Sequence, residues 1–420
     1  MDKTVRKAIF ENFLSLASLQ IITFVIPFII IPYLVRILGP EKYGLLAFAQ
    51  ALMQYFIILI DYGFNLSATR EISIHKADID RVSRIFSAVL TIKLFLWALS
   101  LALLISLVIW VPQLREDRLF YVLSFGSVLG SALFCGFFFL GMEKMKYLFY
   151  LNLLSLLSVA AIFVFVRSEQ HLLRVPLIGS LGSVLIGIAS LWTVYQKFKV
   201  KFYPFDFQQI RHQLRGGWHA FVSQFAIAGY MNTRVFALGL LTNHTLTGYY
   251  ALAEKLMNLI LLFPLTTSIQ VFYPRLSQIF IENQPDSVRI VKKLQRGTNL
   301  LYFFLLLLGF VFAPSIIKIF YGSPYPEAVL SLRILLVAAF LIAANAYRLY
   351  FLMISGRSLV FAKIHIRVTA FGTLLAILFT YWFSYWGTAV SIILTALLAL
   401  AVTNKFPPHL EEDLDAKPAT

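Results

Sequence analysis

The sequence predicts an all-α polytopic membrane protein with about twelve transmembrane helices. Hydrophobic residues make up 60% of the 420 residues and charged residues only 13%, against about 25% charged residues in ordinary soluble domains. A membrane helix needs about 20 apolar residues, so twelve helices account for about 240 residues. The apolar stretches are continuous rather than alternating, which excludes a β-barrel. A mean hydropathy of +0.80 excludes soluble enzymes, nucleic-acid-binding proteins and secreted scaffolds.

Helix-breaking residues separate most of the apolar stretches. Examples are Gly39-Pro40 after the first stretch, Pro112 after the third, and Pro324 and Pro326 before the tenth. The N-terminal end is basic, but no small-residue cleavage site follows the first apolar stretch, so this stretch is interpreted as a span and not as a removed signal peptide. The predicted spans are 13–35, 45–67, 85–111, 119–141, 147–166, 175–195, 217–241, 247–270, 299–320, 327–354, 360–384 and 387–403.

Lysine and arginine are shared unequally between alternate loops. With a cytoplasmic N-terminus, the inside segments hold 23 of these residues and the outside loops hold six, namely Arg36, Lys42, Arg115, Arg118, Arg167 and Arg174. Cytoplasmic loops carry the excess of positive charge in membrane proteins, so both termini are predicted to be cytoplasmic. Much of the net charge of +16 is therefore a topology signal, and no nucleic-acid partner is expected.

Six spans in each half predict two lobes. The N-terminal lobe is predicted at 1–196 and the C-terminal lobe at 217–403, joined by a basic cytoplasmic connector at 197–216 and followed by a cytoplasmic tail at 404–420. The other long inside loop, 271–298, contains the amphipathic stretch SVRIVKKLQRG. Such a stretch is suited to lying on anionic lipid headgroups.

An internal repeat supports the two lobes. A shift of 204 residues aligns YGLLAFAQALMQYFIIL (43–59) with TGYYALAEKLMNLILLF (247–263), and it pairs Gln50 with Glu254 and Gln54 with Asn258. An even number of spans per repeat makes the two repeats parallel, related by an axis along the membrane normal. The predicted architecture is therefore two six-helix lobes around a central cavity, suited to alternating access.

Two ionisable residues of the first half lie inside predicted spans. At about 1.5 Å per residue, Asp61 and Lys93 fall at similar depth in the cytoplasmic third. Gln50, Gln54 and Asp61 lie within about 40° of one another around a helix, which predicts one polar stripe. Ionisable groups at this depth are functional candidates; the alternative is an ion pair that only holds two helices together. The predicted polar or coupling residues of the cavity are Gln50, Gln54, Asp61, Lys93, Glu254 and Asn258.

Cations dominate the ionisable positions in the spans of the second half. The predicted substrate-binding residues are Arg234, Lys255, Arg333, Arg348 and Arg367, opposed only by Glu254. A cationic cavity favours an anionic passenger, and the planar guanidinium suits phosphate. Two alternatives remain open: Arg348 and Arg367 reach the interface as long side chains do, and Arg234 and Arg333 satisfy backbone carbonyls at helix contacts.

Other motifs carry little chemistry. The single cysteine, Cys135, excludes an internal disulfide framework and a cysteine-based metal cluster. The histidines show no metal-ligand spacing, so neither a metal nor a cofactor is expected. Asp78-Ile79-Asp80 resembles the metal-binding motif of sugar-nucleotide transferases, but no nucleotide-binding domain surrounds it. Gly126 and Gly130 predict close packing of the fourth span against another helix. No catalytic residues are predicted.

Three segments resemble a known family. IPYLVRILGPEKYGLLAFAQ (31–50), DYGFNLSATREIS (61–73) and TGYYALAEKL (247–256) resemble bacterial O-antigen or polysaccharide repeat-unit flippases of the Wzx type, in the multidrug/oligosaccharidyl-lipid/polysaccharide (MOP) exporter superfamily. The resemblance covers the whole chain. It departs at Asn232-Thr233-Arg234, where relatives often carry an acidic residue near the end of the seventh span; an ion-coupling role taken from that position is therefore in doubt.

The resemblance implies a flippase rather than an enzyme. It implies a multi-pass protein of the bacterial inner membrane that moves undecaprenyl-diphosphate-linked oligosaccharide from the cytoplasmic to the periplasmic leaflet. The expected partners are this glycan, membrane lipids, and a polymerase and chain-length regulator of the same pathway. One alternative is a multidrug or small-solute antiporter of the same superfamily, whose cavity should be acidic. The other is a membrane polysaccharide polymerase, which usually has a large periplasmic loop, and no such loop is predicted here.

The charge asymmetry makes a testable prediction about topology. Reporter fusions at 242–246 should be active in the periplasm and fusions at 205 active in the cytoplasm, because Lys and Arg accumulate in cytoplasmic loops. Paired alkaline phosphatase and green fluorescent protein fusions measure both. The reverse pattern of activity would overturn the predicted orientation.

Overall fold

The computed structural model describes residues 3–203 and 206–405, and every regular element in them is helical. Its helices are α1 (Lys3–Asp61), α2 (Phe64–Ile74), α3 (Ile79–Trp110), α4 (Pro112–Arg115), α5 (Arg118–Leu133), α6 (Gly136–Gly141), α7 (Met145–Leu153), α8 (Ser155–Phe165), α9 (Arg174–Phe198), α10 (Phe207–Leu241), α11 (His244–Glu282), α12 (Gln284–Tyr321), α13 (Pro326–Ile354) and α14 (Ser358–Thr403). A 3₁₀ turn, Glu169–His171, precedes α9. The predicted all-α polytopic class is confirmed.

The predicted spans lie in these helices, but the two sets do not correspond one to one. Some long helices contain more than one predicted span, and some predicted spans are divided between two helices. Positive φ angles interrupt α1 at Gly39 (71°) and α14 at Ser384 (55°). Therefore α14 holds two predicted spans, and α1 holds the first predicted span and most of the second, which continues into α2. The fourth and fifth spans are each divided, into α5–α6 and α7–α8. Eight helical stretches of the described chain, from Ile29–Ile74 to Leu359–Thr403, are long and apolar enough to cross a membrane.

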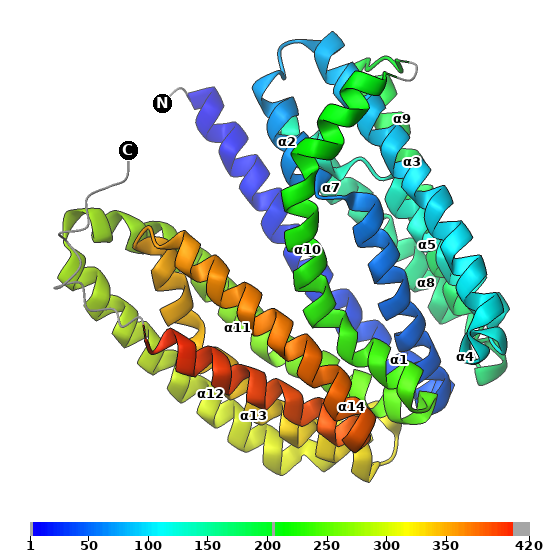
Figure 1. Ribbon diagram of the computed structural model, residues 1–420, viewed down its shortest axis with the longest axis vertical. Helices are drawn as coiled ribbons and strands as arrows, with labels where there is room; N and C mark the ends of the chain where they lie inside the picture. The colour runs from blue at the N-terminus through cyan, green and yellow to red at the C-terminus, as the bar shows by residue number, and fades with distance from the viewer. Residues whose placement is uncertain (1–2, 204–205, 406–420) are drawn as a thin grey trace. The chain divides into compact units, whose positions relative to one another are not determined.

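The chain divides into two compact units, Met1–Asn232 and Thr233–Thr420. The division falls inside α10 (Figure 1). The predicted lobe limits follow the connector and therefore differ from this division at 217–232. The first part of α10 packs with the first unit because Gly217 and Ala220 lie against the turn between α1 and α2: a Cβ at Gly217 would lie 2.9 Å from the Tyr62 carbonyl oxygen.

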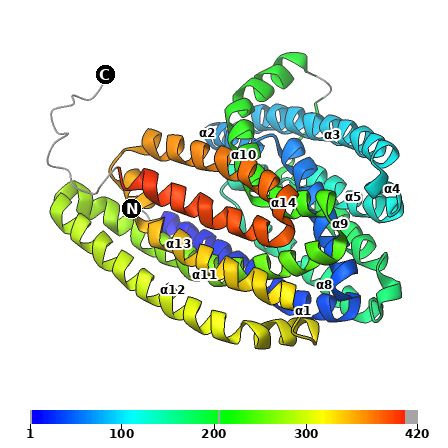
Figure 2. The same ribbon diagram turned by 60° about the horizontal axis from the view of Figure 1, so that its bottom comes forward.

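The first unit is held together by a close helix pair. Figures 1 and 2 show α5 and α9 side by side. A Cβ at Gly126 would lie 2.6 Å from the Ser180 Cβ, and one at Gly130 would lie 2.4 Å from the Ser183 carbonyl carbon. Small residues at such crossings allow two backbones to approach each other. The close packing predicted from Gly126 and Gly130 is confirmed.

The second unit is organised around α13. This helix packs against α11, α12 and α14, and α11, α12 and α13 run alongside one another in Figures 1 and 2. Its buried positions recur at helical spacing, as Leu332, Leu335, Leu336, Ala339 and Ala343 show. A helix with apolar positions on several sides is one that other helices surround.

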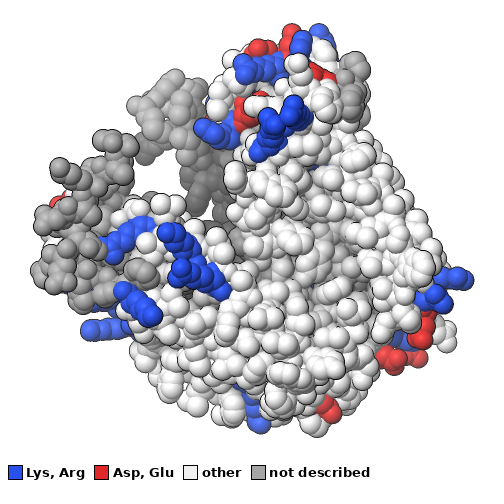
Figure 3. Space-filling model, viewed as in Figure 1, with Lys and Arg blue, Asp and Glu red and all other residues white. Residues whose placement is uncertain are grey.

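Charged side chains gather where helices end. On the face drawn in Figure 3, the blue and red groups lie in a few clusters, and broad areas of the surface carry no charged residue. Large apolar side chains such as Phe95, Leu185 and Phe312 are exposed on the described helices. This distribution is what a bilayer requires, because lipid covers apolar side chains and water reaches the charged ends.

The α5–α9 contact makes a prediction about stability. Gly130→Leu should lower the yield of folded protein, because the new side chain would push α5 away from Ser183, at a typical cost of about 1–3 kcal/mol. The readouts are the monodisperse fraction in size-exclusion chromatography and the melting temperature in detergent. Gly179→Leu is the matched control, since no atom lies within 4 Å of a Cβ at that position of α9. Equal losses for both variants would contradict the packing argument.

Candidate functional site

The first break in a span of the first unit lies between α1 and α2. Asp61 ends α1, and the next two residues have positive φ angles, 41° at Tyr62 and 77° at Gly63. A Cβ at Gly63 would lie 2.6 Å from the Ala220 Cβ, so this position requires glycine both for its backbone angle and for the close approach of α10. The Tyr62 ring stacks on Phe221 of α10 at 4.8 Å and 9°. The turn carrying Asp61 is therefore fixed by packing.

The second break lies between α5 and α6, at Phe134 and Cys135. Inside a membrane the backbone groups that such a break releases must find partners within the protein. The Lys93 ammonium group donates to the Phe134 carbonyl oxygen at 3.1 Å, and the Cys135 N–H donates to the Ser190 hydroxyl at 2.9 Å. Lys93 is 3% exposed and Ser190 is fully buried. Two polar side chains of α3 and α9 thus satisfy the backbone at this break.

An ion pair joins the two breaks. The Lys93 Nζ lies 3.1 Å from Asp61 Oδ1. This contact agrees with the similar depths predicted for the two residues. The Lys93 ammonium also lies 5.9 Å from the centre of the Phe137 ring. Lys93 therefore binds α6, the end of α5 and the end of α1 at once. These contacts give Lys93 a structural role, whereas the Asp61 side chain keeps 24% of its surface exposed.

The rest of the predicted polar stripe is accessible. Gln50 is exposed and Gln54 is partly exposed on the same helix as Asp61. Neither amide is buried against other helices, so both remain available to water or to a passenger. The described structure thus leaves the Gln50–Gln54–Asp61 stripe open along α1.

The second unit contains its own buried charge pair. Arg234 of α10 is 4% exposed and Glu254 of α11 is 9% exposed. The guanidinium NH1 lies 4.0 Å from Glu254 Oε1, and the fully buried Tyr250 donates its hydroxyl to the same oxygen at 3.2 Å. Lys255 is exposed beside this pair, and Asn258 is partly exposed one turn along α11. Two cations therefore flank one carboxylate.

The other three predicted cations lie elsewhere. The Arg333 guanidinium lies 4.8 Å from the centre of the Phe310 ring, and its Nε donates to the Phe310 carbonyl oxygen at 3.1 Å. This is the helix-contact alternative foreseen for arginine. Arg348 donates to Asn404 Oδ1 at the end of α14, and Arg367 is exposed. Among the predicted substrate-binding residues, the structure brings only Arg234 and Lys255 to Glu254.

Some polar groups near the site were not predicted. Tyr250, Ser190 and the Phe134 carbonyl are examples, because nothing in their local sequence distinguishes them from other residues of apolar helices. A further contact joins Gln213, which is 1% exposed, to Glu71 at 2.5 Å. It holds the start of α10 on α2 next to the break that carries Asp61. Sequence spacing between positions this far apart carries no signal of such a contact.

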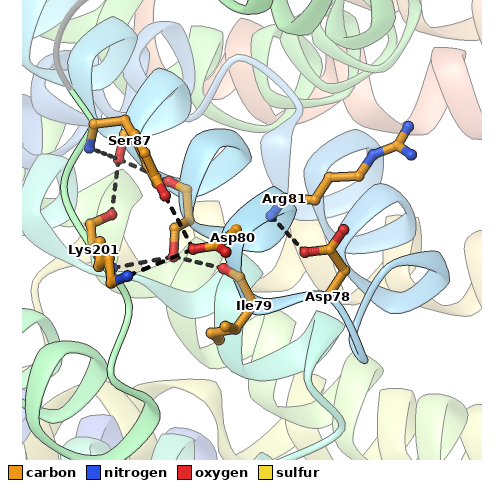
Figure 4. A network of polar contacts seen from close by, with 8 residues as sticks. Asp78, Ile79, Asp80, Arg81, Ser87 and Lys201 are labelled. Atoms are coloured by element: carbon orange, nitrogen blue, oxygen red, sulfur yellow. Dashed lines mark hydrogen bonds and ion pairs between the residues drawn. The ribbon is translucent and has the colours of Figure 1, made fainter.

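The Asp78-Ile79-Asp80 motif has structural roles in this protein (Figure 4). The Asp78 carboxylate caps α3 by accepting from the Arg81 N–H at 3.0 Å. Asp80 accepts from the Tyr203 hydroxyl at 3.0 Å and lies 3.9 Å from the Lys201 ammonium; the hydrogen bond to Asp80 raises the pKa of Tyr203. The Asp80 contacts dock the start of the connector on α3, and the Asp78 contact caps this helix, so both carboxylates have structural partners.

The family described as "Polysaccharide biosynthesis protein" matches residues 9–280 of this chain. Two curated relatives carry the name "Putative O-antigen transporter". The protein of Escherichia coli (strain K12) is 30% identical over 403 residues, which cover 94% of this chain and 96% of the relative. The protein of Shigella dysenteriae is 27% identical over 397 residues, which cover 92% and 97%.

Solved transporters share the fold. An inward-facing multidrug resistance MATE family transporter of the MOP superfamily matches with a TM-score of 0.69 and 13% identity, over 91% of this chain and 97% of that one. The lipid II flippase MurJ in an inward closed conformation matches with a TM-score of 0.66 and 15% identity, over 95% and 88%. At these identities the likeness describes the fold, which agrees with the MOP-type architecture expected from the sequence.

The Asp61–Lys93 contact predicts coupled effects on folding. Lys93→Met should lower the folded yield more than Asp61→Asn, because it removes the partner of both Asp61 and the Phe134 carbonyl. Loss of one partner of a fully buried pair costs about 3–5 kcal/mol, and the partial exposure of Asp61 reduces its share. The double variant should recover part of the loss caused by Lys93→Met alone. Strictly additive losses in detergent melting temperature would show that the two residues are not coupled.

Proposed function

We propose a substrate and a direction of transport for this chain, which belongs to the family of polysaccharide biosynthesis proteins. The protein is a multi-pass membrane transporter and not an enzyme. The proposed substrate is an undecaprenyl-diphosphate-linked oligosaccharide, such as an O-antigen repeat unit. The proposed step carries its headgroup from the cytoplasmic to the periplasmic leaflet of the inner membrane, with both termini of the protein in the cytoplasm.

The relatives of nearly equal length support the substrate class. Both align over more than nine-tenths of this chain, and both are named for O-antigen transport. The charge of the second unit is consistent with a diphosphate: Arg234 and Lys255 outnumber Glu254 within the apolar helices. Cations in such surroundings attract anions more strongly than they do in water, and arginine can bind a phosphate through two parallel hydrogen bonds.

The proposed mechanism is alternating access without covalent chemistry. The charged headgroup crosses in contact with polar side chains while the polyprenyl tail stays in lipid, since moving the tail into water would expose a long hydrocarbon chain. Arg234 and Lys255 bind the diphosphate, and Glu254 limits how tightly they bind it, so that the headgroup can leave. The polar stripe Gln50–Gln54–Asp61 supplies groups suited to sugar hydroxyls.

A multidrug antiporter is the second candidate, and the fold shared with a MATE family transporter favours it. The charges around Glu254 separate the two candidates. An exporter of organic cations needs an excess of carboxylates, whereas here two cations, the buried Arg234 and the exposed Lys255, flank one carboxylate. Deletion of the gene in its native host distinguishes the functions directly. The flippase hypothesis expects loss of surface polysaccharide and accumulation of lipid-linked units, both reversed by the intact gene. Increased drug sensitivity with normal surface polysaccharide would support the antiporter instead.

The Arg234–Glu254 pair makes a prediction about transport. Arg234→Gln leaves Glu254 buried without its cation and should lower the amount of folded protein. The double variant Arg234→Gln with Glu254→Gln replaces the ion pair by two amides, so it should restore the protein level. Polysaccharide display should nevertheless stay at least about tenfold below wild type, because charged hydrogen bonds to the diphosphate are lost.

The controls separate this binding role from a structural one. Arg118→Gln, at the exposed start of α5, removes one arginine charge outside the site and should keep full display. Arg333→Gln separates the binding role predicted for Arg333 from its role in helix packing. A reduced protein level is expected, because the substitution removes the contact with Phe310. Full display by the double variant at a normal membrane level would reject the role of Arg234 in binding.

A further inference from the structure

We propose that the second unit binds an anionic diacyl phospholipid in a groove between α11, α12 and α13. One acyl chain lies in the groove, and the phosphate lies at Lys293 on its rim. This site is separate from the one proposed for the transported lipid-linked glycan. Four features of the structure carry the proposal: the groove's volume, its apolar walls, its length and the cations at one end.

The groove is large enough for a lipid chain. Its volume is about 480 Å³, within the range of roughly 300–1,000 Å³ found for ligand pockets. Leu265 and Phe272 of α11 form one wall, and Leu294 and Leu301 of α12 form another. Gly297 also lines the groove, and no atom lies within 4 Å of a Cβ placed on it. Open space therefore continues up to the backbone of α12.

Most polar groups in the walls already have partners. The Tyr302 hydroxyl donates to the Leu261 carbonyl oxygen at 2.5 Å, and the Ser268 hydroxyl donates to the Leu265 carbonyl oxygen at 2.9 Å. The backbone N–H of Tyr347 donates to the Gln295 side chain at 3.2 Å. Because these donors are engaged inside the protein, the walls offer an occupant mainly apolar contacts. A hydrocarbon chain fits such walls better than a sugar or a peptide backbone does.

The length of the groove matches one leaflet. The lining residues of α12 extend from Ile290 to Tyr302, which is about 18 Å along a helix. Half of a hydrocarbon core of about 30 Å is about 15 Å. Leu301 on the wall is 47% exposed, and its neighbour Leu300 is 59% exposed. The groove is thus continuous with an apolar surface that needs lipid to cover it.

Exposed cations of α12 lie at one end of the groove. Arg289, Lys292, Lys293 and Arg296 are exposed on the first turns of α12, in the amphipathic stretch recognised in the sequence. Arg289 pairs with Asp286 at 3.5 Å. No carboxylate among the described residues forms an ion pair with the other three. The sequence places this end on the cytoplasmic side, and anionic lipids are concentrated in that leaflet. Charge complementarity therefore selects a phospholipid with a net negative headgroup.

The experiment measures lipid binding by the purified full-length protein. Spin-labelled or fluorescent phosphatidylglycerol and phosphatidylcholine are titrated in nanodiscs of neutral lipid. Wild type should bind phosphatidylglycerol more tightly. Lys293→Gln should weaken that binding about fivefold, as expected from removal of one cation near a membrane surface, and leave phosphatidylcholine unaffected. Lys144→Gln, which removes an exposed lysine of the first unit, is the matched control and should bind as wild type does.

A second variant tests the groove itself. Gly297→Leu places a side chain in the open space without a clash, so the protein should fold and melt as wild type does while binding of both labelled lipids falls. Gly179→Leu, also in open space, should not change lipid binding. Unchanged phosphatidylglycerol binding by Gly297→Leu would overturn the proposal. Preferential displacement of the labelled lipid by undecaprenyl phosphate, rather than by unlabelled phosphatidylglycerol, would also overturn it, because the groove would then belong to the transported lipid.

Discussion

The hydrogen-bonding demand of the peptide backbone inside a membrane is the constraint on which this structure depends. Unbroken helices meet the demand by themselves. Three predicted spans of the first unit are broken, after Asp61, at Phe134 and between α7 and α8. A single buried ammonium group serves the first two breaks: Lys93 contacts the Phe134 carbonyl oxygen and the Asp61 carboxylate. A charge that would be costly in lipid is stable here because two acceptors share it. Lys93 thus explains why the turn carrying Asp61 has one defined position.

The turns that this arrangement creates shape their surroundings. The turn after Asp61 projects Tyr62 onto Phe221 and leaves room at Gly63 for the backbone of α10. The first part of α10 consequently packs with the first unit, although it belongs to the span that leads to Arg234. A substitution at Lys93 is therefore expected to act on α10 through these contacts as well as on α1 and α5. Asp61 remains partly exposed at the centre of this assembly.

In the second unit, two buried charged residues pair with each other. Arg234 and Glu254 face each other at 4.0 Å with Tyr250 as a further donor, and Lys255 lies exposed beside them. The two groups lie 4.0 Å apart, and in the proposed mechanism the guanidinium also binds the diphosphate. Arg333 forms its contacts within the α12–α13 pair. The buried Arg234 thus serves recognition in the proposed mechanism, while the partly exposed Arg333 contributes to helix packing.

The sequence by itself determined the all-α membrane class, the helical stretches that hold the predicted spans and the close contact at Gly126 and Gly130. These properties depend on local apolar length and residue size, which a single sequence contains. It also predicted that Asp61 and Lys93 lie at similar depth, because helical rise converts residue number into distance. The tertiary structure alone decided the partners: Phe134 and Ser190 at the broken helix, Tyr250 at Glu254, Phe310 at Arg333, and the α12 wall of the apolar groove. These partners depend on how each helix is rotated about its axis and on where helices break. Rotation and breaks follow from packing against distant segments, and no local pattern records them.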